Sequence, residues 1–155
     1  MKRTVARLCA AVLLLASSVP AVHADEAVFE SSIVGIPVAN QVLRGVPGGG
    51  RPWVVDKGEA RLDADGRLRV KVEGLLLVDA GALTGTTGPV NAVVASLFCR
   101  NSLAATTGAA PLTPAGDAEI EQVIAAPAVC DNPDVLVRIS TNGVVSRWIA
   151  ATSLT

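Results

Sequence analysis

Short runs of β-branched and aliphatic residues recur along this chain, and clusters of Gly, Pro, Asn and Asp separate them. That pattern is typical of an all-β sandwich or barrel. It predicts strands over 32–38, 53–62, 67–78, 90–100, 118–124, 135–140 and 144–151, with a shorter one over 103–107. The run over 118–124 would also fit one face of a short helix, although we expect a strand there. The expected fold is a single-domain antiparallel β-sandwich of about seven to eight strands.

The N-terminus has the order of a secretory signal peptide. Three basic residues lie among the first seven, an apolar run covers 8–16, and small residues lead to Ala24. We expect cleavage after Ala24, because Val22 and Ala24 place small residues at the −3 and −1 positions. The apolar run is shorter than the roughly 20 residues that cross a bilayer. A retained N-terminal anchor is the alternative.

Removal of residues 1–24 would leave residues 25–155, which is enough for one domain with one core. The mature chain would keep 10 basic and 14 acidic residues. A chain with this modest excess of acidic residues lacks the excess of positive charge that is typical of proteins that bind nucleic acid or an anionic membrane surface. We therefore expect a secreted protein, extracellular or periplasmic, with no membrane span after cleavage and no nucleic-acid partner.

The cysteines and the single histidine restrict the chemistry further. Cys9 and His23 fall in the expected signal peptide, so the mature chain keeps only Cys99 and Cys130 and has no histidine. An even pair of cysteines in an exported protein predicts a disulfide. Ser-His-Asp and Cys-His catalysis and histidine metal ligation are unavailable. No catalytic residue, metal or cofactor is expected.

The stretch RLDADGRLRV, 61–70, contains the spacing D-x-D-G of many calcium loops. Apolar residues on both arms share one face only if Ala64, Asp65 and Gly66 form a three-residue loop, in which Gly66 supplies the left-handed conformation. This register places Asp63 opposite Arg67 as a solvent-exposed pair. An EF-hand is excluded, because its first and twelfth positions would be an arginine and a valine. A looser calcium site shared with another loop is the alternative to a plain turn.

The same register has two further consequences for the predicted solvent face. Glu59 lies opposite Lys71, which is a favourable cross-strand pair. Arg61 lies opposite Arg69, which is the one clash of like charges.

A second hairpin is predicted by Asn142-Gly143 between two β-rich arms, with Gly143 as a turn glycine. A two-residue turn pairs Thr141 with Val144, Val137 with Trp148 and Val135 with Ala150. Trp148 then lies in the core, with stacking on a ligand as the alternative. Arg138 and Arg147 face each other on the exposed side.

Two Gly-rich segments lie over 46–53 (VPGGGRPW) and 81–90 (GALTGTTGPV). The first offers consecutive main-chain N–H groups beside Arg51, which is an arrangement that can hold an anion. It lacks the G-K-[ST] and the helix of a phosphate loop, since Pro52 and a β-like run follow. For both segments we favour a structural connection.

The segments VPGGGRPWVV, GEARLDADGRLRVKVEGLLLV and TGTTGPV, together with the spacing of Cys99 and Cys130, resemble a group of small secreted bacterial proteins of unknown function. The resemblance covers most of the mature chain. Its motifs are structural in character, so it implies no catalytic or binding residue.

The sequence favours a non-enzymatic exported β-sandwich with a binding, envelope-associated or structural role, acting through loops at one end of the sheets. Its partner would be an extracellular ligand or an envelope component. The alternative is a carboxylate-dependent hydrolase of extracellular glycans, because paired Asp or Glu side chains can perform glycosidic acid–base chemistry. The candidate carboxylates lie in or near loops: Asp56, Asp79, Asp131 and Asp134.

Overall fold

The computed structural model of the 155-residue chain describes residues 26–155. The expected signal peptide and its cleavage position after Ala24 lie outside the described residues. Within them the only helix is one 3₁₀ turn, Gly81–Leu83, and the remaining regular structure is β-strand. No helix of this part is long and apolar enough to cross a membrane. The all-β class is confirmed.

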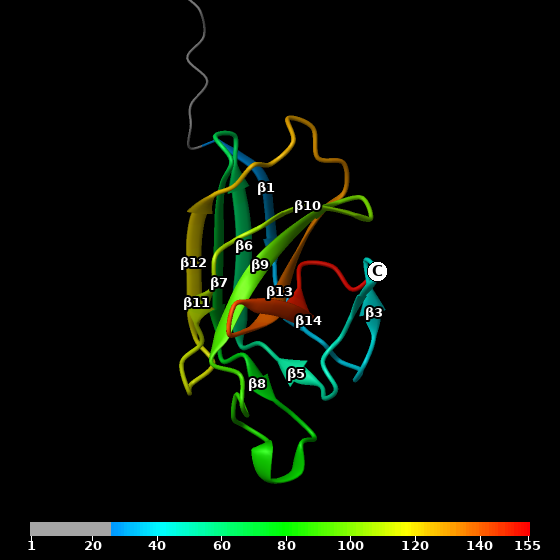
Figure 1. The fold of residues 1–155 in the computed structure, drawn as a ribbon, viewed down its shortest axis with the longest axis vertical. Helices are drawn as coiled ribbons and strands as arrows, with labels where there is room; N and C mark the ends of the chain where they lie inside the picture. The colour runs from blue at the N-terminus through cyan, green and yellow to red at the C-terminus, as the bar shows by residue number, and fades with distance from the viewer. Residues whose placement is uncertain (1–25) are drawn as a thin grey trace, which may run out of the picture.

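Two antiparallel sheets form two facing layers (Figure 1). The first has the order β1–β6–β7–β12 and consists of β1 (Ala27–Ser32), β6 (Lys57–Asp63), β7 (Arg67–Glu73) and β12 (Ala118–Val123). The second has the order β10–β9–β13–β14–β2 and consists of β10 (Ser102–Thr106), β9 (Ala92–Cys99), β13 (Pro133–Thr141), β14 (Val144–Ala151) and β2 (Val34–Gly35), with β11 (Ala110–Pro111) paired to β9. The segment over 118–124 is therefore a strand.

The core lies between the two sheets. On β7, Leu68, Val70 and Val72 are buried and alternate with charged residues that point outward, as a half-covered strand requires. On β9, consecutive residues are buried, because this central strand of the second sheet is covered on both faces.

Two short ribbons complete the fold. β3 (Val42–Leu43) pairs with β4 (Val46–Pro47), and β5 (Trp53–Val54) pairs with β8 (Leu76–Leu77). The turn of the first ribbon consists of Arg44 and Gly45, which both have positive φ (51° and 76°). The side-chain pattern does not predict this ribbon, since each of its strands has only two residues.

Several expected strands are divided or displaced. The run over 53–62 separates into β5 and β6, and the run over 67–78 separates into β7 and β8. At the break Gly74 has a φ of 66°, and the Asp56 side chain fills the place where a Gly74 Cβ would stand. The two arms thus leave the first sheet together and pair again as a ribbon. The strand expected over 32–38 was wrong, because β1 begins at Ala27 and β2 covers only two residues.

The C-terminal hairpin has the predicted turn but not the predicted register. Thr141 pairs with Val144, and Asn142 and Gly143 have φ of 50° and 79°. Irregularities then shift the pairing, so that Val137 lies opposite Ala150 and Arg138 opposite Trp148.

The predicted pairings of Val137 with Trp148 and of Val135 with Ala150 were therefore wrong. Extra residues in β14 change which side chains of the two strands face each other. Trp148 is nevertheless fully buried, and its Nε1 donates a hydrogen bond to the Gln41 carbonyl (3.0 Å). Arg138 is half-buried rather than exposed, whereas Arg147 is exposed as expected.

Candidate functional site

A hollow of about 350 Å³ lies at one end of the sandwich, where the start of β1, the β6–β7 turn and the segment between β12 and β13 meet. We call it the end hollow. Most of its lining residues are apolar by type, although polar atoms supply more than half of the surface that they expose to it: Val28, Phe29, Leu62, Ala64, Ile124, Ala126, Pro127, Ala128, Cys130 and Pro133, with Asp63, Asp65 and Gly66 as the rest. Its volume lies in the range of small-molecule sites. The loops at this end of the sheets therefore enclose a space that a ligand can enter.

The β6–β7 turn forms one wall of the end hollow and has the predicted geometry. Gly66 has a φ of 85°, and its N–H donates to the Asp63 carbonyl (3.0 Å). Asp65 Oδ1 accepts the Arg67 N–H (2.9 Å). Ile124 N donates to the Gly66 carbonyl (2.9 Å), so the turn is fastened to the end of β12.

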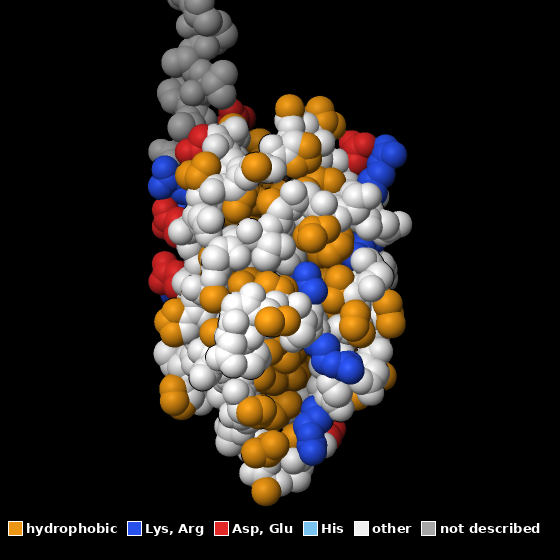
Figure 2. All heavy atoms as spheres, viewed as in Figure 1, with side chains coloured by type: hydrophobic (Ala, Val, Ile, Leu, Met, Phe, Trp, Pro, Cys, Tyr) orange, Lys and Arg blue, Asp and Glu red, His pale blue; other side chains and the backbone are white. Residues whose placement is uncertain are grey.

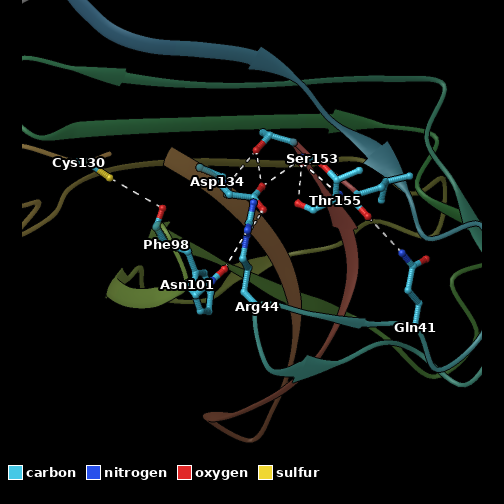
Figure 3. Close-up of polar contacts among 11 residues, drawn as sticks. Gln41, Arg44, Phe98, Asn101, Cys130, Asp134, Ser153 and Thr155 are labelled. Atoms are coloured by element: carbon cyan, nitrogen blue, oxygen red, sulfur yellow. Dashed lines mark hydrogen bonds and ion pairs between the residues drawn. The ribbon is translucent and has the colours of Figure 1, made fainter. Parts of the chain in front are cut away.

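The opposite wall is fastened by the disulfide between Cys99 and Cys130, whose Cα atoms are 4.9 Å apart. Cys130 Sγ also lies 3.8 Å from the Phe98 carbonyl oxygen (Figure 3). Next to the disulfide, Arg100 contacts Asp131 through both its main chain (2.7 Å) and its guanidinium (2.6 Å). The disulfide was predicted, and it holds a long loop against β9 where few backbone hydrogen bonds do so.

Asp63, the last residue of β6, lines the end hollow and differs from its prediction. Its side chain was expected to pair with Arg67 in solvent, but the residue is only 1% exposed. Arg61 Nε lies 2.7 Å from Oδ1, and Arg69 Nη1 lies 2.9 Å from Oδ2. The expected clash between Arg61 and Arg69 is thus relieved, because both guanidinium groups share one buried carboxylate.

Apolar side chains stand exposed around the end hollow. Val28 is 61% exposed and Val129 is 75% exposed, and Val123 at the end of β12 is exposed as well. Figure 2 shows hydrophobic side chains gathered at the upper end of the molecule, over the loop between β12 and β13. Exposed apolar groups that adjoin a hollow are typical of a binding surface. This loop is not among the sites predicted from the sequence, although its apolar run AAPAV before Cys130 was a visible signal.

Asp134 is the most completely buried of the four carboxylates considered for hydrolysis. It has no exposed surface, and the Arg44 Nε lies 3.0 Å from its Oδ2. Its Oδ1 accepts hydrogen bonds from Thr152 Oγ1 (2.7 Å) and from Ser153 N (3.2 Å) (Figure 3). Arg44 in turn donates to Asn101 Oδ1 (3.0 Å). Asp134 therefore joins the β3–β4 turn, the start of β13 and the C-terminal segment.

The other three carboxylates lie apart from that cluster. Asp131 is exposed and paired with Arg100 at the same end of β13. Asp56 packs against Gly74 beside β5, and Asp79 follows β8 with a φ of 49°. Figure 1 places β5 and β8 at the opposite end of the molecule from the start of β13. Two of the four candidate carboxylates therefore lie at one end of the sandwich and the other two at the opposite end.

Most carboxylate oxygens of the D-x-D-G stretch are already engaged and are not free to bind a metal ion. Both Asp63 oxygens lie against arginines, and Asp65 Oδ1 accepts a main-chain hydrogen bond. Over residues 26–155 no group of three or more His, Cys, Asp or Glu side chains is arranged to hold a metal ion.

The outer face of the first sheet carries basic and acidic side chains next to one another. Glu59 lies opposite Lys71 as predicted, and Lys71 Nζ is 3.0 Å from Glu73 Oε1. This hydrogen bond and the attraction between the two charges lower the pKa of Glu73 and raise the pKa of Lys71. A face of such exposed pairs is typical of a solvated sheet.

No family model, curated protein or solved structure matches the chain.

Proposed function

We propose that this protein is an exported, non-enzymatic binding module that holds a small ligand with both apolar and polar groups in the end hollow. The observation that carries the proposal is the combination of a loop-walled hollow of about 350 Å³ with the exposed Val28 and Val129 at its side. A disulfide is compatible with an oxidising compartment, which supports export.

The lining offers aliphatic and proline side chains together with exposed polar atoms, which supports a ligand that has both kinds of group. Asp63 is the most buried polar group there, and its charge is balanced by Arg61 and Arg69. Contact with aliphatic and proline side chains would supply part of the binding energy, and the polar atoms of the lining would orient the ligand.

The test compares three forms of the purified protein, each immobilised and exposed to a culture supernatant. Ala128→Trp fills the end hollow from its exposed wall, whereas Ala82→Trp places the same side chain on the exposed 3₁₀ turn outside it. Mass spectrometry of the eluates should find a compound retained by the parent and by Ala82→Trp and lost from Ala128→Trp. Equal retention by all three forms, or none by the parent, would contradict the proposal.

A further inference from the structure

Three cations differ from all others in the described chain. Every lysine and arginine of residues 26–155 has a carboxylate within 4.0 Å except Arg51, Arg138 and Arg147. The other seven cations are thus paired locally, and acidic side chains outnumber basic ones over the rest of the described residues. Positive charge without a counter-charge is concentrated in these three side chains, which we call the arginine surface.

The three residues belong to neighbouring segments around Trp148. Arg138 lies opposite Trp148 in the β13–β14 pair, and Arg147 precedes Trp148. Gly48 bridges to Trp148, and Gly49 N donates to its carbonyl (2.9 Å), which brings the loop that contains Arg51 alongside β14. Figure 2 shows basic side chains following one another over β14 and toward β5, beside hydrophobic ones, with an acidic side chain next to the lowest of them.

Two of these guanidinium groups are held in place by neutral oxygens. Arg138 Nε and Nη2 donate to the Ser146 carbonyl (2.9 and 2.7 Å), and Arg147 Nη1 donates to the Gly48 carbonyl (2.7 Å) and to Asn40 Oδ1 (3.2 Å). Such bonds orient the groups without cancelling their charge. Burial lowers the pKa of Arg138, which is the effect of partial desolvation without a counter-charge.

The glycine loop adds main-chain donors at the same place. The N–H groups of Gly50 and Arg51 have no hydrogen-bond acceptor within the described residues, and both residues are exposed. Asn40 Oδ1, which accepts from Arg147, lies 4.0 Å from the position of a Gly50 Cβ. The loop tip and the Arg147 guanidinium therefore adjoin the same oxygen.

Gly50 is not required by the fold. Its φ is not positive, and a Cβ would meet only that one atom within 4 Å. Gly48 differs, because a Cβ there would collide with Ile36 and would lie 2.5 Å from the Gln41 carbonyl oxygen. A glycine without a conformational or packing reason is typical of a backbone that a ligand approaches closely.

We propose that the arginine surface, with the main-chain N–H groups of Gly50 and Arg51, binds a phosphate group. The available donors exceed the roughly four lone-pair sites of a carboxylate and suit an oxyanion with more acceptor oxygens and a double charge. The phosphate belongs to a free phosphorylated small molecule or to the headgroup of a phosphate monoester lipid. This site is separate from the end hollow and does not depend on its function.

The first experiment titrates the purified protein with inorganic phosphate and follows the amide resonances of Gly50 and Arg51. Their shifts should saturate, and Arg51→Gln and Arg147→Gln should each weaken binding about tenfold. Gly50→Val should do the same with an unchanged melting temperature. Arg100→Gln is the matched control, because that exposed arginine already has Asp131 as its partner, and binding should be unchanged.

The second experiment measures sedimentation with phosphatidylcholine vesicles that contain or lack phosphatidic acid. Binding of inorganic phosphate without co-sedimentation identifies a free phosphorylated ligand, and co-sedimentation only with phosphatidic acid identifies the headgroup. The Arg51→Gln and Arg147→Gln variants should lose whichever binding is found. Absence of both kinds of binding, or equal loss in Arg100→Gln, would overturn the proposal.

Discussion

Arg44 Nε lies 3.0 Å from Asp134 Oδ2, and the Asp134 side chain has no exposed surface. The arginine stands in the turn of the short β3–β4 ribbon, and the aspartate stands at the start of a central strand. A ribbon of two-residue strands has few hydrogen bonds of its own. This ion pair and the Trp148 hydrogen bond to Gln41 therefore help to fix its position, together with the hydrogen bond from Gly49 N to the Trp148 carbonyl.

Asp134→Asn should destabilise the protein strongly. It leaves the Arg44 guanidinium, 18% exposed, beside a neutral amide, and removal of one partner of a buried pair costs about 3–5 kcal/mol. Urea unfolding measures the change. Asp131→Asn is the control, because both members of its pair with Arg100 are exposed, and it should cost about 0–1 kcal/mol. Equal effects of the two substitutions would show that the Arg44–Asp134 pair does not hold the ribbon.

Cys99→Ala combined with Cys130→Ala should lower the unfolding free energy by about 3–4 kcal/mol, by the chain-entropy estimate for a loop of this length. The bond also holds one wall of the end hollow, so this variant should lose any ligand retained there. Intact mass before and after alkylation checks the oxidised state of the parent. Two thiols that alkylate without reduction would contradict it.

Trp148→Ala should cost about 3–5 kcal/mol, because it opens a cavity at a fully buried site. Arg147→Ala, at an exposed neighbour, removes the hydrogen bonds to the Gly48 carbonyl and to Asn40 Oδ1 and should cost about 1 kcal/mol. Thermal unfolding ranks the two. A Trp148→Ala protein as stable as the parent would move this residue from the core to a ligand-contacting role.

Local patterns predicted much of the fold. The alternation over 67–73 and the position of Gly66 sufficed for the β6–β7 register, since one face is buried and only one loop length aligns the arms. The same reasoning failed in β14, because the irregularities on either side of the Arg138–Trp148 pair leave no mark on an alternation of side chains. It also misplaced Asp63, whose position on the polar face gave no sign that two arginines would cover it.

The candidate sites were less accessible to sequence reasoning. The end hollow depends on where the loop before Cys130 folds back, and the arginine surface depends on which cations lack carboxylates in space. The negative net charge of the chain gave no sign of the arginine surface, because the acidic residues that make the chain negative lie elsewhere. Only the glycine loop over 46–53 was visible in advance as a possible anion site.

Gly66→Ala and Gly143→Ala separate two costs of replacing a glycine. Both residues have similar positive φ, 85° and 79°, which costs an L-residue about 1–2 kcal/mol. A Cβ at Gly66 would lie 2.8 Å from the Ile124 carbonyl oxygen, whereas nothing lies within 4 Å of one at Gly143. Gly66→Ala should therefore be the more destabilising in urea. The reverse order would show that the turn is not fastened to β12 as described.

Calcium should leave the stability of the parent unchanged. The Asp63 oxygens already contact Arg61 and Arg69, and a cation there would have to displace those pairs. If a calcium site existed, free calcium at 100 times its dissociation constant would add about 2.7 kcal/mol to the unfolding free energy. Urea unfolding in millimolar calcium and in chelator should therefore give the same midpoint. A gain with calcium that disappears in Asp63→Asn with Asp65→Asn would show that the D-x-D-G turn also binds metal.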